Sequence, residues 1–287
     1  MSACDSCPSK SGCTSQSTCP SANGGAAKPS APQKEAQNAN SNIKTVIGVA
    51  SGKGGVGKSF VTTMLAIELS RKGYKVGIMD ADITGPSIPR AFGLKETLTA
   101  TEENHIVPAE SATGIKAVSL NLLMEDEDAP VIWRGPVVSG LVKQFWTDVD
   151  WGMLDVLLID MPPGTSDVPL TVFQSIPLDG LVLVSTPQDL VSMIVSKQRN
   201  MAKMMKVNIL GLVENMSYIK CPHCDEKIAL FGNDMALKRA SEEAGVKILD
   251  KLPLDPETTS YVDTGRAEAI KEELLTNTVA EISKLIS

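Results

Sequence analysis

The sequence is poor in aromatic residues and has no excess of basic ones. Aromatic side chains make up 4% of the 287 residues, too few for a surface on which nucleic-acid bases stack. The formal net charge is -7 and no Lys/Arg-rich run is present, so we expect no electrostatic binding of nucleic acid. Apolar runs such as Val156–Ile159 and Leu181–Val184 are far shorter than the roughly 20 residues that span a bilayer. The composition therefore argues against nucleic-acid and membrane partners.

The N-terminus lacks the apolar segment of a secretory signal peptide. We therefore expect a cytoplasmic protein, in surroundings where disulfides are rare. The chain has 6 cysteines and only 2 histidines. In a reducing compartment such cysteines are expected to be metal ligands or redox groups and not structural disulfides.

The chain changes character near residue 42. Residues 1–42 contain no aromatic side chain and, apart from Met1, no large aliphatic one, although they hold most of the cysteines. Such a segment cannot bury enough apolar surface to offset its conformational entropy. We predict two parts, a disordered, cysteine-containing tail over 1–42 that binds metal and a globular domain over 43–287.

The globular part alternates apolar runs of strand length with helical patterns. Nearly continuous apolar runs are typical of strands that are buried on both faces of a parallel sheet. Apolar residues at helical spacing between Val61 and Leu69, followed by Gly73 as a C-cap, predict one helix, and Asp189–Lys206 predicts another. The alternation predicts an α/β fold, a doubly wound, mostly parallel sheet with ligands at the carboxyl ends of its strands. The predicted strands are Ile43–Ser51, Lys75–Asp82, Asp155–Pro162, Gly180–Pro187, Asn208–Asn215 and Lys247–Leu254.

The stretch SGKGGVGKS, Ser51–Ser59, has the pattern of a phosphate-binding loop. The motif follows a predicted strand and opens a predicted helix, which is the context that it needs. Its glycines allow backbone N–H groups to converge on phosphate oxygens, and the helix N-terminus adds partial positive charge. Lys58 is expected to reach the β- and γ-phosphates, and the Ser59 hydroxyl to bind Mg²⁺. The residues expected to contact the nucleotide here are Gly52, Lys53, Gly54, Gly55, Val56, Gly57, Lys58, Ser59 and Phe60.

Three aspartates lie at the ends of predicted strands. Asp160 closes VLLID, where an NTPase holds its metal-directed carboxylate, and the following MPPGTSD is a candidate sensor of the γ-phosphate. Asp80 and Asp82 end another strand and are candidates to orient the attacking water and the metal. One aspartate alone at such a place is more often a turn or cap residue. Three of them beside a phosphate loop favour a catalytic interpretation.

Four motifs and the phosphate loop together resemble a known family. GKGGVGKS is similar to the deviant phosphate loop of the MinD/ParA/nitrogenase-iron-protein class, in which a lysine directly follows the first glycine. DADITGPS, IDMPPGTSD, GLVENMS and a CxxC shortly afterwards, in this order, look like the Mrp/ApbC family of iron–sulfur cluster carrier ATPases. The resemblance extends from Ile43 to the C-terminus and is weaker in the tail.

This resemblance implies roles for four residues around the nucleotide. Lys53 is implied to cross a dimer interface and contact the partner's nucleotide, as an arginine finger does, whereas the local pattern alone would favour a solvated lysine. Asn215 matches the position whose amide hydrogen-bonds adenine, which implies ATP and not GTP; a turn-stabilising asparagine is the alternative. Pro253 and Asp255, in PLDPE, are implied to close over the base from the other side.

Cys221-Pro-His-Cys224 is a single CxxC motif for which three interpretations compete. A thioredoxin-like redox pair would open a helix after the first strand of its fold, whereas this pair follows a late strand. A zinc ribbon needs a second pair of ligands, which the globular part does not supply. The third interpretation is half of an iron–sulfur site, because a cluster takes about four thiolates and a two-fold dimer supplies two pairs. The resemblance implies this last one, a bridging 4Fe–4S cluster, with zinc as the next alternative.

The tail, CDSCPSKSGCTSQSTC, carries thiols at Cys4, Cys7, Cys13 and Cys19. Four thiols match the ligand count of one 4Fe–4S cluster within one chain. The core from Cys4 to Cys13 is similar to the N-terminal motif of the eukaryotic cytosolic scaffold branch of the family, although there the fourth cysteine lies upstream. Because Cys19 lies downstream, zinc is a competitor, since four-cysteine zinc sites tolerate varied spacing. We predict a second metal site that orders the tail locally.

The motifs and the resemblance together predict a homodimeric ATPase that binds ATP, Mg²⁺ and a 4Fe–4S cluster and passes the cluster to apo iron–sulfur proteins. ATP binding and hydrolysis are expected to change the dimer geometry and so the exposure of the cluster. A ParA/MinD-like positioning ATPase would need a basic amphipathic C-terminal helix or a basic surface, whereas residues 268–287 are rich in glutamate. A metal-insertion chaperone for one dedicated enzyme is a further alternative.

Overall fold

The computed structural model describes residues 34–82, 87–95, 97–101, 105–123, 135–164, 167–187, 191–224, 226–231 and 235–286. The predicted metal ligands Cys4, Cys7, Cys13 and Cys19 lie outside the described residues. The unit described here begins at Lys34. None of its helices is both long and apolar enough to cross a membrane.

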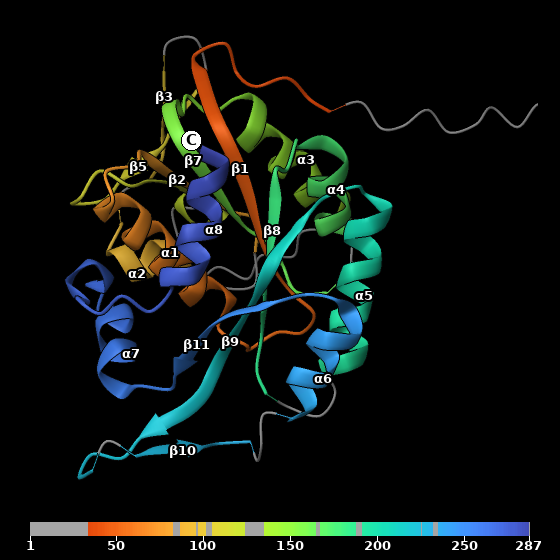
Figure 1. Ribbon diagram of the computed structural model, residues 1–287. Helices are drawn as coiled ribbons and strands as arrows, with labels where there is room; N and C mark the ends of the chain where they lie inside the picture. The colour runs from red at the N-terminus through yellow and green to blue at the C-terminus, as the bar shows by residue number, and fades with distance from the viewer. Residues whose placement is uncertain are drawn as a thin grey trace, which may run out of the picture. The chain divides into compact units, whose positions relative to one another are not determined.

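A mostly parallel sheet forms the centre of this unit (Figure 1). Its strands lie in the order β10-β9-β8-β1-β7-β2-β6-β5, and β11 pairs with β9. The β5–β6 and β9–β10 pairs are antiparallel and the others are parallel. The strands of this sheet are β1 (Ser41–Ser51), β2 (Val76–Asp80), β5 (Ala109–Glu110), β6 (Lys116–Ser119), β7 (Gly152–Asp160), β8 (Gly180–Ser185), β9 (Ile209–Lys220), β10 (Lys227–Ala229) and β11 (Ile248–Pro253). A separate pair is formed by β3 (Thr99–Ala100) and β4 (Ile106–Val107).

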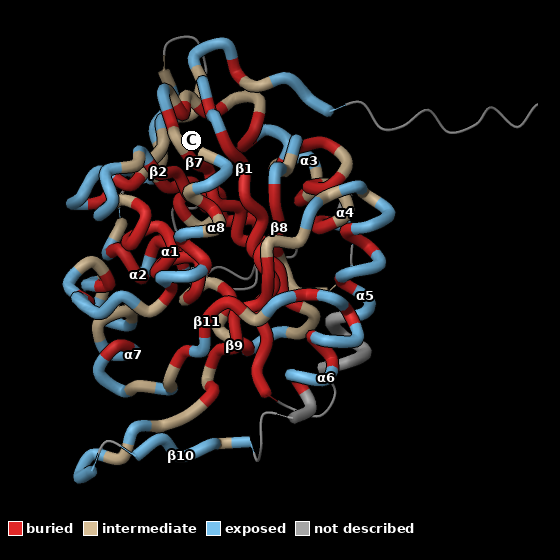
Figure 2. The backbone as a smooth tube through the Cα atoms, in the orientation of Figure 1, coloured by how far each residue is buried: buried red, intermediate tan, exposed pale blue. Residues whose placement is uncertain are grey.

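Helices cover both faces of the sheet, as expected for a doubly wound fold. One apolar core lies between the sheet and α3 to α6, and a second lies between the sheet and α1, α2, α7 and α8. Figure 2 shows the central strands buried between these two layers. The helices are α1 (Lys58–Arg71), α2 (Ser87–Phe92), α3 (Gly135–Thr147), α4 (Asp167–Ser175), α5 (Val191–Met204), α6 (Met235–Ala244), α7 (Pro256–Asp263) and α8 (Thr276–Ile286), with short 3-10 turns at Leu120–Leu123 and Ala267–Ala269. The predicted α/β fold is confirmed.

All six predicted strands are present, and β9 differs most from its predicted bounds. It continues five residues past its predicted end at Asn215, to Lys220. Pairing explains the extension, because Tyr218 lies opposite Pro253 of β11 and Ala229 of β10. Two short partners, one in the adjoining hairpin and one later in the chain, thus prolong a strand that its own apolar run does not mark.

The domain also begins before the predicted boundary at residue 42. Asn38 is buried and donates from Nδ2 to Asp150 Oδ1 at 2.8 Å. The indole Nε1 of Trp146 donates to the Glu35 carbonyl at 3.0 Å, and Lys34 Nζ donates to the Ile176 carbonyl at 2.9 Å. Polar groups therefore attach residues 34–40 to the domain, and the apolar content of this segment could not reveal that.

The register of the sheet brings the predicted aspartates together. Asp160 at the end of β7 lies opposite Asp80 at the end of β2 on one side and Val49 of β1 on the other. Because these strands are parallel, their carboxyl ends meet at one edge of the sheet. The phosphate loop leaves β1 at the same edge, so the loop and the two aspartates form one site.

Candidate functional site

The phosphate loop connects β1 to α1 and surrounds an open cavity of about 340 Å³. Gly57, at the N-cap of α1, has a φ of 79° in the left-handed region that glycine adopts at little cost. A Cβ atom there would lie 2.2 Å from Asn215 Nδ2, so a side chain is also excluded sterically. The residues that line the cavity are Ser51, Gly54, Gly55, Val56, Gly57, Lys58, Ser59, Phe60, Thr63, Asp82, Ser87, Pro163 and Val262.

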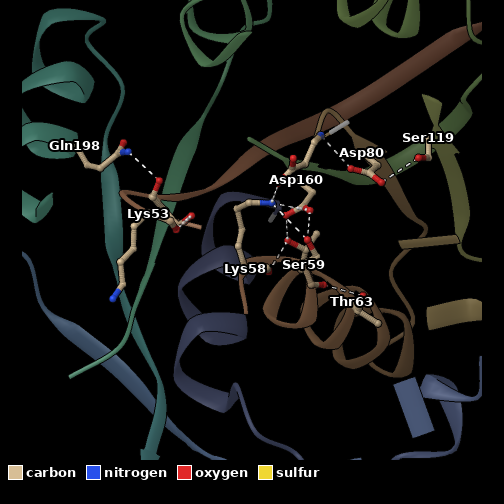
Figure 3. Close-up of polar contacts among 11 residues, drawn as sticks. Lys53, Lys58, Ser59, Thr63, Asp80, Ser119, Asp160 and Gln198 are labelled. Carbon is tan, nitrogen blue, oxygen red and sulfur yellow. Dashed lines mark hydrogen bonds and ion pairs between the residues drawn. The ribbon is translucent and has the colours of Figure 1, made fainter. Parts of the chain in front are cut away.

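Lys58 lies in a cluster of oxygen atoms beneath this cavity (Figure 3). Its Nζ is 2.8 Å from Asp160 Oδ2, 3.3 Å from Asp82 Oδ2 and 3.4 Å from Ser59 Oγ. Asp160 is fully buried and accepts hydrogen bonds from Ser59 Oγ at 2.6 Å and from Thr62 Oγ1 at 2.8 Å. The motif residues of the loop and of the β7 end are therefore in direct contact.

The pKa values of Lys58 and Asp80 are both raised, for different reasons. Burial acts to lower the pKa of Lys58, but the charges of Asp160 and Asp82 outweigh it, so the pKa lies above its ordinary value. Lys58 therefore stays charged at neutral pH. Burial, and next the charge of Asp160, raise the pKa of Asp80 well above the ordinary carboxyl value.

The structure separates the two aspartates at the end of β2. Asp80 is 2% exposed, and its two oxygens accept hydrogen bonds from Ser119 Oγ and from the Asp82 backbone N–H, both at 3.0 Å. Asp82 lines the cavity, whereas Asp80 does not. Of this pair, Asp82 can face a bound nucleotide and Asp80 supports the turn that carries it.

The oxygen donors at this edge fit a magnesium ion. Mg²⁺ prefers carboxylate and hydroxyl oxygens and usually keeps several waters. Ser59 and Asp82 present such oxygens to the cavity. Asp160 does not line the cavity but accepts a hydrogen bond from the Ser59 hydroxyl, which does. The donor set therefore matches the predicted metal, and the assignment of Ser59 and Asp160 as Mg²⁺ ligands stays a prediction.

A test of the electrostatics is Asp80→Asn, which keeps the shape of the side chain and removes its charge. We expect the free energy of unfolding at pH 7 to rise, because burial and the charge of Asp160 disfavour the ionised Asp80 carboxylate in the folded protein. The folded protein binds the extra proton between the ordinary value of 3.8 and the raised pKa, so wild-type stability falls as pH rises through that window. The gain should therefore vanish below pH 3.8.

Urea unfolding at several pH values measures this difference. Asp82→Asn is the matched control, because Asp82 is 14% exposed and its charge is better solvated. An equal gain in both variants, or a gain for Asp80→Asn that persists at low pH, would contradict the assignment.

A second cavity, of about 230 Å³, adjoins the first. The two share Gly57, Phe60 and Val262, so they form one groove along the loop and the start of α1. The predicted base-contacting residues all line the second cavity, which brings them together as expected. Its lining is Gly57, Phe60, Asn215, Met216, Pro253, Leu254, Asp255, Thr258, Thr259 and Val262.

Two of these residues also have structural roles that the sequence did not indicate. Asn215 Nδ2 donates to the Val56 carbonyl at 2.9 Å and so fixes the end of the phosphate loop. Asp255 is the N-cap of α7 and accepts from the Thr258 N–H at 2.8 Å. Although burial acts to raise it, hydrogen bonds from the Thr258 hydroxyl and then from its backbone N–H hold the pKa of Asp255 below its ordinary value. Both side chains shape the groove before any nucleotide binds.

Lys53 lies apart from this cluster. Its side chain points away from Lys58 and Asp160 in Figure 3, and neither Gly52 nor Lys53 lines the cavity. The Lys53 carbonyl accepts from Ser51 Oγ at 3.0 Å, which closes the first turn of the loop. The side chain thus does not face the nucleotide cavity of its own chain, and its predicted contact in trans stays a prediction.

The cysteine pair lies on the hairpin between β9 and β10. Cys221 follows the last residue of β9, and its N–H donates to the Glu226 carbonyl at 2.9 Å. Both thiols are free, and Cys221 is half-buried whereas Cys224 is exposed. Hydrogen bonds from the His223 N–H and then from Cys224 lower the pKa of Cys221, which favours the thiolate. Among the described residues no third His, Cys, Asp or Glu side chain joins the two thiols, so the hairpin offers two ligands.

Sequence reasoning missed several buried polar residues at the site: Thr62 and Ser119, which donate to Asp160 and Asp80, and Gln198. Gln198 of α5 donates to backbone carbonyls at the start of the phosphate loop and in the turn after β7. The only available signal for Gln198 was a polar residue within a predicted helix, which is usually a solvated position. Its location under the loop depends on tertiary packing.

Comparison with known proteins places this site in a family. Residues 42–287 match the ParA family model, which is described as NUBPL iron-transfer P-loop NTPase. The iron-sulfur cluster carrier protein of Clostridium perfringens is 50% identical over 275 residues, which cover 93% of this chain and 94% of that protein. The carrier protein of Methanocaldococcus jannaschii is 44% identical over 263 residues, covering 91% and 87%.

Solved structures agree with this assignment. A nucleotide-binding protein from Archaeoglobus fulgidus, in complex with ADP, superposes with a TM-score of 0.71 at 41% identity, covering 80% of this chain and 90% of that one. The cell division ATPase MinD of Pyrococcus furiosus has a TM-score of 0.59 at 21% identity over 84% of this chain and 99% of its own, which shows a shared fold. The resemblance drawn from the sequence motifs is confirmed, and the chain belongs to the ParA/NUBPL family of iron-transfer P-loop NTPases.

Proposed function

We propose that this protein is an ATP-dependent carrier of iron–sulfur clusters. Two copies of the chain would bind one 4Fe–4S cluster between them, hydrolyse ATP and transfer the cluster to apo-proteins. The observation that carries this proposal is the continuity of β9. This strand holds Asn215 in the nucleotide groove and leads, five residues later, into the cysteine hairpin.

This geometry supports coupling between the two sites. A parallel strand in the sheet is stiff, and β9 is held by β11 on one side and by β8 and β10 on the other. The loop after β11 adds a second link, because Leu254 N–H donates to the Tyr218 carbonyl at 2.8 Å and Leu254 lines the nucleotide groove. A nucleotide that moves either segment would therefore move the hairpin with it.

The groove supports hydrolysis of a nucleoside triphosphate. Backbone N–H groups of the loop and the Lys58 ammonium would bind the β- and γ-phosphates. Asp82, at the cavity wall, would orient the attacking water, with Asp80 holding its turn in place. Mg²⁺, when bound by Ser59 with support from Asp160, would neutralise developing phosphate charge. Lys53 of the partner subunit would add charge stabilisation in trans.

The hairpin supports a shared cluster as the cargo. Cys221 and Cys224 offer two sulfur ligands, and a cluster requires about four. A two-fold axis through the hairpin would supply the second pair. Relatives that match over more than nine-tenths of the chain carry the name iron-sulfur cluster carrier protein, which agrees with this cargo.

Anaerobic purification followed by iron and sulfide analysis and a cluster-transfer assay tests the function. We expect acid-labile sulfide equimolar with iron and activation of several unrelated apo-acceptors, with transfer rates that depend on ATP. One zinc per chain without sulfide would overturn the proposal. Activation of a single acceptor enzyme would favour the metal-insertion chaperone.

Removal of the tail tests the predicted second metal site. Deletion of residues 1–33 should remove about four iron and four sulfide per chain, while the shared cluster and ATPase activity persist. The deletion stops at residue 33 because Lys34 and Asn38 bond to the domain. Deletion of residues 1–42 should also lower the melting temperature. Unchanged iron and sulfide after removal of 1–33 would show that the tail holds no cluster.

A further inference from the structure

The side chain of Gln198 joins two segments of the nucleotide site. Gln198 lies in α5 and is 2% exposed. Its Nε2 donates to the Ser51 carbonyl at 3.2 Å, at the start of the phosphate loop (Figure 3). The same Nε2 donates to the Gly164 carbonyl at 3.0 Å, in the turn after β7. The Gly164 N–H donates to the same Ser51 carbonyl at 2.8 Å. One amide therefore ties the loop to the turn.

The contact requires a side chain that carries at least two N–H donors. Both partners are carbonyl oxygens, so only a side chain with two N–H donors can bridge them. Gln198 Oε1 is buried and has no partner among the described residues, which costs free energy. Packing alone would be better served by an apolar side chain of similar length. The bridge explains why a glutamine is buried at this position.

The turn that Gln198 holds forms a wall of the phosphate cavity. Pro163 lines that cavity, and its Cγ would lie 3.9 Å from a Cβ built on Gly54 of the loop. The turn begins at Asp160, which contacts Ser59 and Lys58. The spacing between the Ser51 end of the loop and Gly164 therefore sets the width of the cavity where a terminal phosphate would lie.

We propose that Gln198 is a positioning residue that fixes the Pro163–Gly164 turn against the phosphate loop for nucleotide hydrolysis. The inference rests on the proposed ATPase function. Gln198 does not line the cavity of the phosphate loop, so it acts through the two backbone carbonyls. The binding of a diphosphate depends on the loop N–H groups and on Lys58, and a substitution of Gln198 leaves these groups in place. Turnover depends on the Pro163–Gly164 turn as well.

The test is Gln198→Met, which keeps the length of the side chain and removes its donors, in the full-length protein. We expect kcat for ATP to fall at least about tenfold, because misplacement of site groups by about 1 Å is costly to catalysis. KM and the Kd for ADP should change less than about twofold. Hydrogen exchange of the segment after Asp160 should become faster in the nucleotide-free protein.

Two further variants make the outcome decisive. Gln198→Leu also removes the donors without introducing a buried charge and should reproduce the defect if the methionine variant fails to fold. Asn200→Met makes a similar change at an exposed position of the same helix and should alter neither readout. Wild-type kcat and exchange in a folded donor-less variant would overturn the positioning role, as would an equal loss of ADP affinity. If the wild type hydrolyses no ATP, the proposed function fails, and hydrogen exchange alone decides the role of Gln198.

Discussion

Replacement of Cys221 by alanine is expected to abolish the cluster shared by two chains. Each hairpin presents two free thiols, so the variant dimer retains two sulfur ligands where a cluster needs about four. Iron and sulfide should each fall by about two per chain, which is half of one 4Fe–4S cluster. Iron bound by the tail should stay. Metal analysis of anaerobic protein, with size-exclusion chromatography to follow the dimer, measures the loss.

The nucleotide site should be unaffected by this change. Cys221 and Cys224 line neither cavity of the groove, so the Kd for ADP is expected to stay within about twofold. His223→Ala is the matched control in the same loop, because alanine keeps the backbone N–H that bonds to Cys221. Loss of the cluster in that control would indicate a loop that has collapsed. Retention of the full cluster without Cys221 would contradict the shared site.

The sequence could predict those parts of the site that depend on local pattern. The phosphate loop is set by glycines and a lysine at fixed spacing, and Asp80 and Asp160 end buried strands. In a parallel sheet, strand ends meet at one edge, so these residues come together without knowledge of the packing. The alternation of strands and helices was sufficient to predict the fold class, because such alternation gives a parallel sheet covered by helices on both faces.

Other features arise only from contacts between distant segments. The bonds from Gln198 to Ser51 and from Asn215 to Val56 join residues more than 140 positions apart. Asp80 is buried and accepts a hydrogen bond from Ser119, whereas Asp82 lines the cavity. The sequence could not show which of the two would face the cavity. No spacing within the sequence marks such pairs, because tertiary packing of the helices and strands determines them.

Both lysines of the phosphate loop should be essential, but for different steps. Lys58→Ala removes the cation that is predicted to contact the β- and γ-phosphates, so we expect nucleotide affinity to fall about 100-fold or more. Stability should also fall, by about 3 kcal/mol, because the buried Asp160 carboxylate loses its partner. Lys53→Ala should leave ADP affinity within about twofold and reduce kcat about 100-fold or more, as loss of a charge supplied in trans does.

Mixing the two variants distinguishes a contact in trans from one within the chain. In a mixed dimer the Lys53→Ala subunit retains Lys58 and binds nucleotide, while the Lys58→Ala subunit still supplies Lys53 across the interface. Random exchange of equal amounts gives about half mixed dimers with one complete site each, so about a quarter of wild-type activity should return. If Lys53 acted on its own chain's nucleotide, neither subunit would hold a complete site and activity would not return. Equal losses of affinity in the two single variants would refute the trans role as well, since Lys53 would then bind phosphate directly.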